Sequence, residues 1–194
     1  MNLPDHPATM QTSLQICLPD WVGDFIEPMQ SFVTDEQRVA LAISLATRNM
    51  ELGTGGPFGA AIFDEHGALV SVGVNRVLPL ACSVAHAEIV AFVLAQARLQ
   101  RARLNDDGGR FTLATSAQPC CQCYGATFWA GVDTVLIGAR SEDVQELTEF
   151  DEGPLPADWV GELEARGITV RRDILRADAR GVFTRFRELG GAAY

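Results

Sequence analysis

The stretch Phe111–Ala139, FTLATSAQPCCQCYGATFWAGVDTVLIGA, decides the fold of this chain. Its two ends, FTLATSA and DTVLIGA, are rich in apolar and β-branched residues, which is typical of strands. Between these ends, CQCYGATFWAG predicts a short helix. A strand, a helix and a second strand within one such stretch indicate an α/β domain.

The segments on either side extend this alternation. Residues 58–64 and 68–77 predict an antiparallel hairpin. The segment 85–99, AHAEIVAFVLAQARL, predicts a helix with an almost entirely apolar face. GITV at 167–170 predicts another strand, and a final helix is expected from about residue 172 to 188. Together the elements predict a three-layer α/β/α sandwich on a five-stranded mixed sheet.

The N-terminal part of the chain differs in character from the rest. Residues 1–33 are expected to be irregular and to form an extension packed on the main body. A helix follows, because Thr34 and Gln37 have the spacing of a capping box. We therefore expect the main domain to span 34–194. Three aromatic residues are the expected anchors of the extension: Trp21, Phe25 and Phe32.

The composition disfavours several functional classes. The 194 residues carry a formal net charge of −10, whereas proteins that bind nucleic acid present clustered Lys and Arg. No apolar run approaches the roughly 20 residues that cross a bilayer, and the start, MNLPDHPATM, does not resemble a signal peptide. An odd number of cysteines, five, predicts reduced thiols in the cytoplasm. We therefore expect a small-molecule partner, with neither nucleic acid nor a membrane.

Cys120, Cys121 and Cys123 crowd into four consecutive positions. In a helix, residues three apart share a face, whereas adjacent residues are rotated by about 100°. Cys120 and Cys123 therefore direct their sulfur atoms to one point, and Cys121 faces elsewhere. A helix N-terminus also favours the thiolate form that a metal requires. We predict that Cys120 and Cys123 are metal ligands and that Cys121 is not.

A C-x-x-C pair has two other interpretations, half of a structural zinc site and a thiol–disulfide redox pair. A structural site needs a second pair of ligands, and Cys17 and Cys82 are isolated in the sequence. His86 is the expected third ligand, although an isolated histidine is more often a core residue. Glu88 favours catalysis, because a carboxylate on an otherwise apolar helix is costly to bury without a task. Three ligands and an open position are the arrangement of catalytic zinc.

The two motifs, HAE at 86–88 and PCCQC at 119–123, match the H-x-E and P-C-x-x-C signature of the zinc-dependent nucleobase deaminases in the cytidine deaminase superfamily. Further blocks resemble the guanine deaminase branch, which also includes ammeline deaminases: GGPFGAAIF, GVNRV, CSVAHAEIVA, PCCQCYGATFWAGV and FDEGPLPADWVGELEARGITV. This resemblance covers roughly residues 34–194. One departure is Gln118, where the branch commonly has Glu before the Pro-Cys.

The resemblance implies a cytidine-deaminase-like fold and hydrolytic deamination of guanine to xanthine, with ammeline as a further substrate. It implies one zinc ion per chain, held by His86, Cys120 and Cys123. Zinc in such a site lowers the pKa of water from 15.7 towards about 7, and Glu88 moves protons between that water and the base. Glu152, in the segment FDEGP, is expected to assist proton transfer to the departing ammonia.

The same resemblance implies a set of base-binding residues. Asn75 offers an amide donor and acceptor to the edge of a purine, although an Asn in the sequence NRV is equally a turn residue. The backbone N–H of Ala87, at the start of a helix, is a further donor. Three more residues are expected in the pocket or over it: Phe58, which is equally a core residue, Phe150 and Asp151.

Other functions share parts of this pattern. Cytosine, cytidine and guanosine-type nucleoside deaminases use the same zinc chemistry, and only the resemblance of the FDEGP tail argues against the cytosine class. A tRNA adenosine deaminase shares both motifs, but a net charge of −10 disfavours a surface for the anticodon. A zinc-stabilised interaction module without catalysis is disfavoured by Glu88 and by the open fourth position. The resemblance also implies a homodimer and a role in purine metabolism.

Overall fold

The computed structural model describes residues 12–26, 31–191 and 193. Its five strands lie in one sheet in the order β2-β1-β3-β4-β5. Their bounds are β1 Gly59–Asp64, β2 Leu69–Val74, β3 Phe111–Ala117, β4 Thr134–Ala139 and β5 Thr169–Arg171. Strand β1 pairs antiparallel with β2 and β3, whereas β3, β4 and β5 are parallel. The predicted five-stranded mixed sheet is confirmed.

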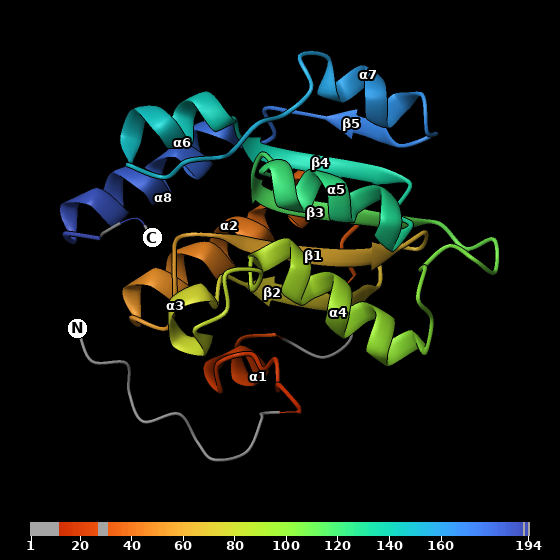
Figure 1. Cartoon of the computed structure of the whole chain (residues 1–194), viewed down its shortest axis with the longest axis horizontal. Coiled ribbons are helices and arrows are strands. Elements are labelled where there is room, and N and C mark those ends of the chain that lie inside the picture. Colours follow the sequence, from red (N-terminus) through yellow and green to blue (C-terminus); the bar gives the residue numbers. More distant parts are fainter. Residues whose placement is uncertain (1–11, 27–30, 192, 194) are drawn as a thin grey trace.

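Helices cover both faces of the sheet, as Figure 1 shows. Their bounds are α1 Trp21–Phe25, α2 Asp35–Glu51, α3 Val77–Leu80, α4 Ala87–Leu99, α5 Cys121–Ala130, α6 Ser141–Leu147, α7 Trp159–Glu164 and α8 Arg176–Glu188. Helices α2 and α8 lie behind the sheet in this view, and α4 and α5 lie in front of it. This is the predicted three-layer sandwich. Among the residues that the structure describes, no helix combines the length and the apolar character needed to cross a membrane.

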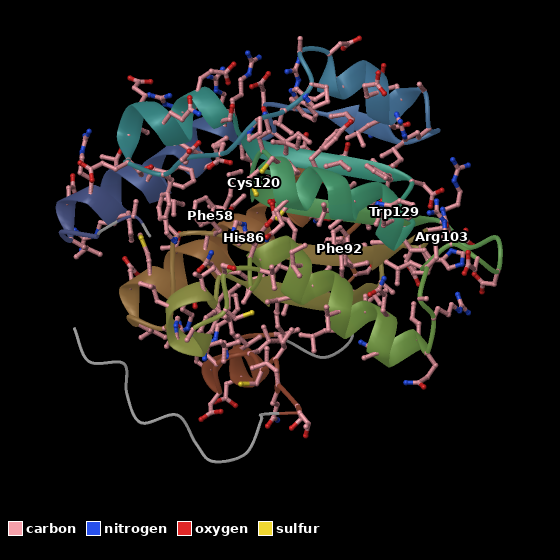
Figure 2. All side chains as sticks on the ribbon, in the orientation of Figure 1. Phe58, His86, Phe92, Arg103, Cys120 and Trp129 are labelled. Atoms are coloured by element: carbon pink, nitrogen blue, oxygen red, sulfur yellow. The ribbon has the colours of Figure 1, made fainter. Side chains whose placement is uncertain are left out.

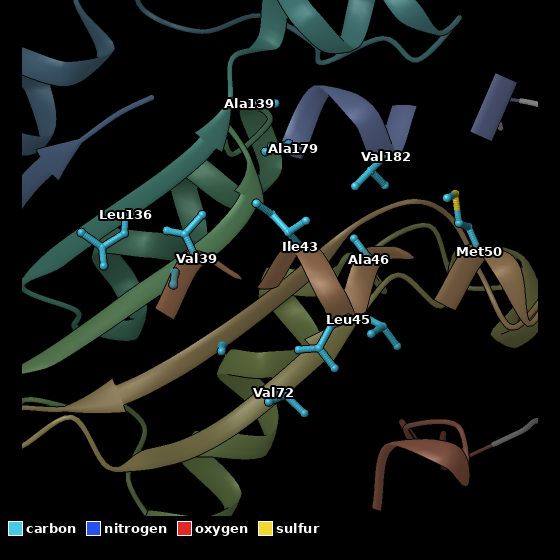
Figure 3. Packing of buried hydrophobic residues seen from close by; sticks show 14 of the residues in the cluster. Val39, Ile43, Leu45, Ala46, Met50, Val72, Leu136, Ala139, Ala179 and Val182 are labelled. Atoms are coloured by element: carbon cyan, nitrogen blue, oxygen red, sulfur yellow. The ribbon is translucent and has the colours of Figure 1, made fainter. Parts of the chain in front are cut away.

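Alternation along β1 supplies both halves of the core. Ala60 and Ile62 pack with residues of α4, whereas Ala61 and Phe63 pack with residues of α2 and α8. Side chains of a strand point to alternate faces, so one strand holds two helical layers together. Figure 3 shows the layer around α2. The buried residues labelled there are Val39, Ile43, Leu45, Ala46, Met50, Val72, Leu136, Ala139, Ala179 and Val182.

Helix α2 begins as the sequence predicts. The Thr34 hydroxyl accepts a hydrogen bond from the backbone N–H of Gln37, at 3.2 Å. The Gln37 side chain in turn accepts from the backbone N–H of Thr34, at 3.1 Å. This reciprocal capping box satisfies two amide groups that a helix start otherwise leaves unpaired.

Several predicted boundaries are wrong, for local reasons. Strand β2 ends at Val74 rather than 77, because α3 begins at Val77. The last strand begins at Thr169 rather than 167, because Gly167 has a φ of +81° and forms a turn. The final helix begins at Arg176 rather than 172, because Asp173 and Leu175 have φ angles of 68° and 52°. Helices α3 and α7 are short and were not predicted.

The N-terminal segment contains a helix, α1, within the stretch predicted to be irregular. All three expected anchors pack against the core: Phe32 is buried, and Trp21 and Phe25 are half-buried. The Arg48 guanidinium of α2 lies 5.7 Å from the Trp21 ring and 5.4 Å from the Phe25 ring, which fixes α1 by cation–π contact. The predicted division at residue 33 falls partly outside the described residues and stays a prediction.

Asp143 is a buried acid in the first turn of α6. Its side chain is 1% exposed and accepts hydrogen bonds from Arg176, at 2.7 and 2.8 Å, and from Arg180. It also caps α6 by accepting from the backbone N–H of Arg140 at 2.9 Å. The Arg176 hydrogen bonds hold the pKa of this carboxyl well below its usual range. Asp143 therefore joins α6 to α8.

Candidate metal and active site

Three side chains converge where α4 and α5 begin. His86 is the N-cap residue of α4, and Cys120 is the N-cap residue of α5. The Nδ1 atom of His86 lies 3.4 Å from Sγ of Cys120 and 3.6 Å from Sγ of Cys123. Figure 2 shows His86 and Cys120 near each other between the two helices. The predicted ligand set is thus assembled at one point, with its ligand atoms within 4.8 Å of one another.

These spacings fit zinc. Bond lengths near 2.3 Å to sulfur and 2.1 Å to nitrogen, in a tetrahedral arrangement, separate the two ligand atoms by roughly 3.6 Å. A hydrogen bond with Cys123 lowers the pKa of Cys120 to about 4, and the same bond raises the pKa of Cys123 well above its ordinary value. Both cysteines would bind zinc as thiolates, so binding of the metal would release the proton of Cys123. His86, Cys120 and Cys123 are positioned to hold one zinc ion.

A cavity of about 190 Å³ opens beside these ligands. Most of the predicted site residues line it: Phe58, Asn75, His86, Glu88, Cys120, Phe150, Asp151 and Glu152. Three further lining residues were not among the predicted ones: Val77, Ser83 and Gln118. Ala87 and Cys123 are fully buried and do not line it. Val77 and Ser83 belong to the blocks GVNRV and CSVAHAEIVA, but no chemistry of their side chains singles them out. Gln118 is noticeable in the sequence through its departure from the guanine deaminase pattern.

Glu88 lies in the first turn of α4, two residues after His86. Its side chain is 6% exposed and lines the cavity. Burial, assisted by the negative charge of Cys120, raises the pKa of Glu88 to about 7. A carboxyl beside the metal ligands can therefore accept and release a proton near neutral pH.

Glu152 is the second buried acid of the cavity. It is 7% exposed, and burial raises its pKa to about 8, with the charges of Cys120 and Glu88 adding to the effect. The backbone of this loop is attached to α5, because the Cys121 N–H donates to the Glu152 carbonyl at 2.9 Å. The next residue, Gly153, has a φ of +66°. Cys121 does not belong to the cluster of His86, Cys120 and Cys123. Its backbone N–H instead attaches the loop of Glu152 to α5.

Aromatic rings form one wall of the cavity. Phe58 and Phe150 meet edge to face with ring centroids 5.1 Å apart. Behind them, Phe183 packs 5.5 Å from Phe58, and Phe186 stacks 5.7 Å from Phe150. Both outer rings belong to α8, so the C-terminal helix supports the wall on which a planar ligand can rest.

Asn75 follows β2 and is 2% exposed. Its backbone N–H donates to the Phe58 carbonyl at 3.1 Å, and its side-chain Oδ1 accepts from the Val77 N–H at 3.2 Å. The second bond fixes which end of the amide is the oxygen. Because the residue lines the cavity, its amide nitrogen is available as a donor for a ligand.

Comparison with known proteins agrees with this geometry. Residues 33–139 match the family described as the cytidine and deoxycytidylate deaminase zinc-binding region. A guanine deaminase of Bacillus subtilis is 37% identical over 111 residues, which cover 57% of this chain and 67% of that protein. A probable cytosine deaminase of Schizosaccharomyces pombe is 34% identical over 93 residues, covering 48% of this chain and 53% of that protein.

Solved structures extend the likeness to nearly the whole chain. A guanine deaminase of Nitrosomonas europaea is 40% identical with a TM-score of 0.87, and the match covers 93% of this chain and 100% of that one. A complex with 2,6-diaminopurine is 41% identical with a TM-score of 0.88, covering 95% and 98%. The family match spans more than half of the sequence and contains all three metal ligands. The chain therefore belongs to the zinc-binding cytidine and deoxycytidylate deaminase family.

Proposed function

We propose that this chain hydrolyses guanine to xanthine and ammonia, with the aminotriazine ammeline as a second substrate. One observation carries the proposal: two buried carboxyls, Glu88 and Glu152, line one cavity with the metal ligands His86 and Cys120. The relatives support a purine substrate. Two of them are named guanine deaminases. Two of the similar solved structures are complexes with 2,6-diaminopurine and with 8-azaguanine.

Zinc held by the three ligands supplies Lewis acidity, which lowers the pKa of water to about 7. We assign the first proton transfer to Glu88, which lines the cavity close to the ligands. Glu88 accepts a proton as the water oxygen adds to carbon C2 of guanine, and it delivers this proton to the adjoining ring nitrogen. Protonation of the ring makes C2 more electrophilic as the new C–O bond forms.

We assign the second transfer to Glu152. The adduct carries a hydroxyl and an amino group on C2, and the bond to the amino group must break. Glu152 moves the hydroxyl proton to the amino nitrogen, so that ammonia leaves while the hydroxyl becomes the carbonyl of xanthine. Guanine and water are thus converted into xanthine and ammonia, and both carboxyls return to their starting states.

We assign the positioning of the base to residues that line the cavity and to one backbone group at the start of α4. The Asn75 amide and the backbone N–H of Ala87 are assigned as donors to the ring edge. Phe58 and Phe150 provide the apolar wall, with Asp151 beside them. A planar aromatic ring stacks well against such a wall, which favours a nucleobase over a flexible amine.

A cytosine deaminase is the second candidate, because one relative bears that description. Ammonia release from guanine, ammeline, cytosine, adenine and their nucleosides, measured together with zinc content, separates the two functions. We expect turnover of guanine by protein that contains one zinc per chain. Turnover of cytosine or cytidine without turnover of guanine would contradict the proposal.

We also propose a cytoplasmic homodimer. The reduced thiols expected from the five cysteines support the compartment. The indole of Trp129, 73% exposed on α5, supports association, because large exposed aromatic side chains are typical of interfaces. Sedimentation of the wild-type protein and of Trp129→Ala tests this assembly: a dimer that weakens in the variant is expected, and a wild-type monomer would contradict it.

A further inference from the structure

Asn49 is a buried carboxamide in the last turn of α2 and lies outside the cavity lining. Its side chain is 0% exposed. The Nδ2 atom donates to the Gly56 carbonyl at 2.9 Å and to the Asn75 carbonyl at 3.0 Å. The Oδ1 atom accepts from the Thr54 hydroxyl at 2.8 Å. Both donor hydrogens are used, so the amide has one orientation and binds the backbone of a cavity residue.

The hydrogen bonds continue from Asn49 to the N-terminal helix. The Thr54 hydroxyl that donates to Asn49 accepts, in turn, from Nε1 of Trp21 at 3.0 Å. The Thr54 carbonyl accepts from the guanidinium of Arg76. Trp21 of α1 is thus connected to Asn75 through two intermediate residues, although 54 positions separate the two in the sequence.

The backbone of Asn75 depends on this network. Its N–H is bound to Phe58, as described above, and the Asn49 amide donates to its carbonyl. Gly55 passes so close that a Cβ there would overlap the Asn75 carbonyl and lie 2.6 Å from Nδ2 of Asn49. With no side chain at this position, the loop 54–56 reaches Asn75 directly, and a shift of the loop displaces the Asn75 amide.

We propose that Trp21, Thr54 and Asn49 form a positioning relay that sets the Asn75 amide in the cavity. Through it, α1, an element outside the sheet, tunes the binding of the base. The inference rests on the proposed function, which assigns Asn75 to base binding. The relay contains neither metal ligands nor the two acids, so disturbing it changes KM more than kcat.

Thr54→Val and Thr54→Ser are the matched test. Valine keeps the shape of the side chain but removes the hydroxyl between Trp21 and Asn49, whereas serine keeps the hydroxyl. We expect Thr54→Val to raise KM for guanine about 3–10-fold with kcat within about twofold, as the net value of one or two hydrogen bonds implies. Thr54→Ser should restore KM. Thr47→Val is the control, because the Thr47 hydroxyl lies on α2, as Asn49 does, and donates to the Ile43 carbonyl rather than to the relay.

A second readout does not depend on turnover. In ¹H–¹⁵N spectra of zinc-loaded protein, the Asn75 side-chain amide is identified by its disappearance in Asn75→Asp. The resonance of this amide should shift in Thr54→Val and Trp21→Phe, and it should keep its wild-type position in Thr54→Ser and Thr47→Val. If the wild-type protein deaminates no base, the proposed function fails. The Asn75 resonance still shows whether Trp21 and Thr54 set the position of the Asn75 amide.

Two results would overturn the relay. The first is an Asn75 resonance unmoved in both Thr54→Val and Trp21→Phe, with KM unchanged. The second is a loss confined to kcat in these variants. Trp21→Phe keeps the aromatic packing and leaves Thr54 and Asn49 in place, so it decides the matter even where Thr54→Val does not fold.

Discussion

The backbone N–H of Cys121 donates a 2.9 Å hydrogen bond to the carbonyl oxygen of Glu152. This bond joins the metal-binding helix α5 to the loop that carries the second acid. The loop lies about thirty residues further along the sequence, and its attachment fixes one buried carboxyl beside another. The metal centre and the proposed proton carrier are therefore parts of one local structure.

Replacing Gly153 should uncouple that loop without disturbing the metal. Gly153 has a φ of +66°, and a Cβ there would lie 2.5 Å from the Cys121 sulfur. We expect Gly153→Ala to lower kcat for guanine at least about tenfold, because acid–base assistance is worth about 10²–10⁴-fold and depends on geometry. Zinc content should stay at one per chain. Gly167→Ala is the control, since Gly167 also has a positive φ but nothing within 4 Å of an added Cβ; equal activity of both variants would contradict the coupling.

Substitution of the proposed metal ligands should remove the zinc. His86→Ala, Cys120→Ala and Cys123→Ala should each lose zinc and activity, because a catalytic zinc site has three protein ligands and each variant keeps two. Cys121→Ala should keep its zinc, since this sulfur lies outside the ligand set. Metal content of the purified proteins gives the answer. Full zinc content in Cys120→Ala would show that the assignment is wrong.

Glu88→Gln should separate metal binding from catalysis. The amide has nearly the same shape but cannot carry a proton, so one zinc per chain should remain while turnover falls by at least about 10²–10⁴-fold. Steady-state kinetics and metal analysis on the same sample check both statements. A rate within tenfold of wild type would mean that another residue transfers the proton.

Glu152→Gln tests the second acid. Turnover of guanine should drop at least about 10²-fold, with zinc content and folding unchanged. Glu149→Gln, an exposed acid three residues earlier in the same segment, is the control and should be nearly silent. If both variants behave like wild type, the segment is a solvated connector.

The buried ion pair of Asp143 should make the free energy of unfolding depend on pH in the acid range. Its folded-state pKa is depressed by Arg176, so its contribution is fully present above the unfolded pKa of about 3.9 and is lost as pH falls through the lower folded value. Stability should therefore decline progressively below about pH 5. Asp143→Asn should be less stable at pH 7 by about 1.5–3 kcal/mol, the value of hydrogen bonds to charged groups. Urea unfolding of the wild type and of Asp143→Asn at pH 7 and pH 4 measures both effects. If both proteins lose the same free energy of unfolding between these pH values, Asp143 is not the source of the acid sensitivity.

Much of the site could be predicted from the sequence, because its chemistry lies in short motifs at helix starts. The i, i+3 spacing of Cys120 and Cys123 predicts their convergence, and the structure places His86 against both sulfur atoms. Most of the expected cavity residues, Glu88 and Glu152 among them, line one cavity. The place of Glu152 at the site was predicted from the family resemblance alone, because no local pattern in the sequence connects residue 152 to residue 86.

The rest depends on tertiary contacts that no local pattern reports. Asp143 looks like an exposed acid in a first helical turn, and only the return of α8 places Arg176 against it. Asn49 reads as a polar residue near a helix end. Its position three residues after Ala46, on the buried face of α2, is the one signal that a polar partner is present. Helix α7 is too short to show helical periodicity.

The aromatic wall makes the shape of the cavity sensitive to a residue that does not line it. Phe186 of α8 stacks on Phe150, and Gly191 lies so close to the Phe186 ring that a side chain there would overlap it. Residue 191 therefore bears on Phe186, the ring that lies behind Phe150 of the cavity wall. Any side chain at this position would push Phe186 toward Phe150, so variation at residue 191 would change the shape of the cavity from outside its lining.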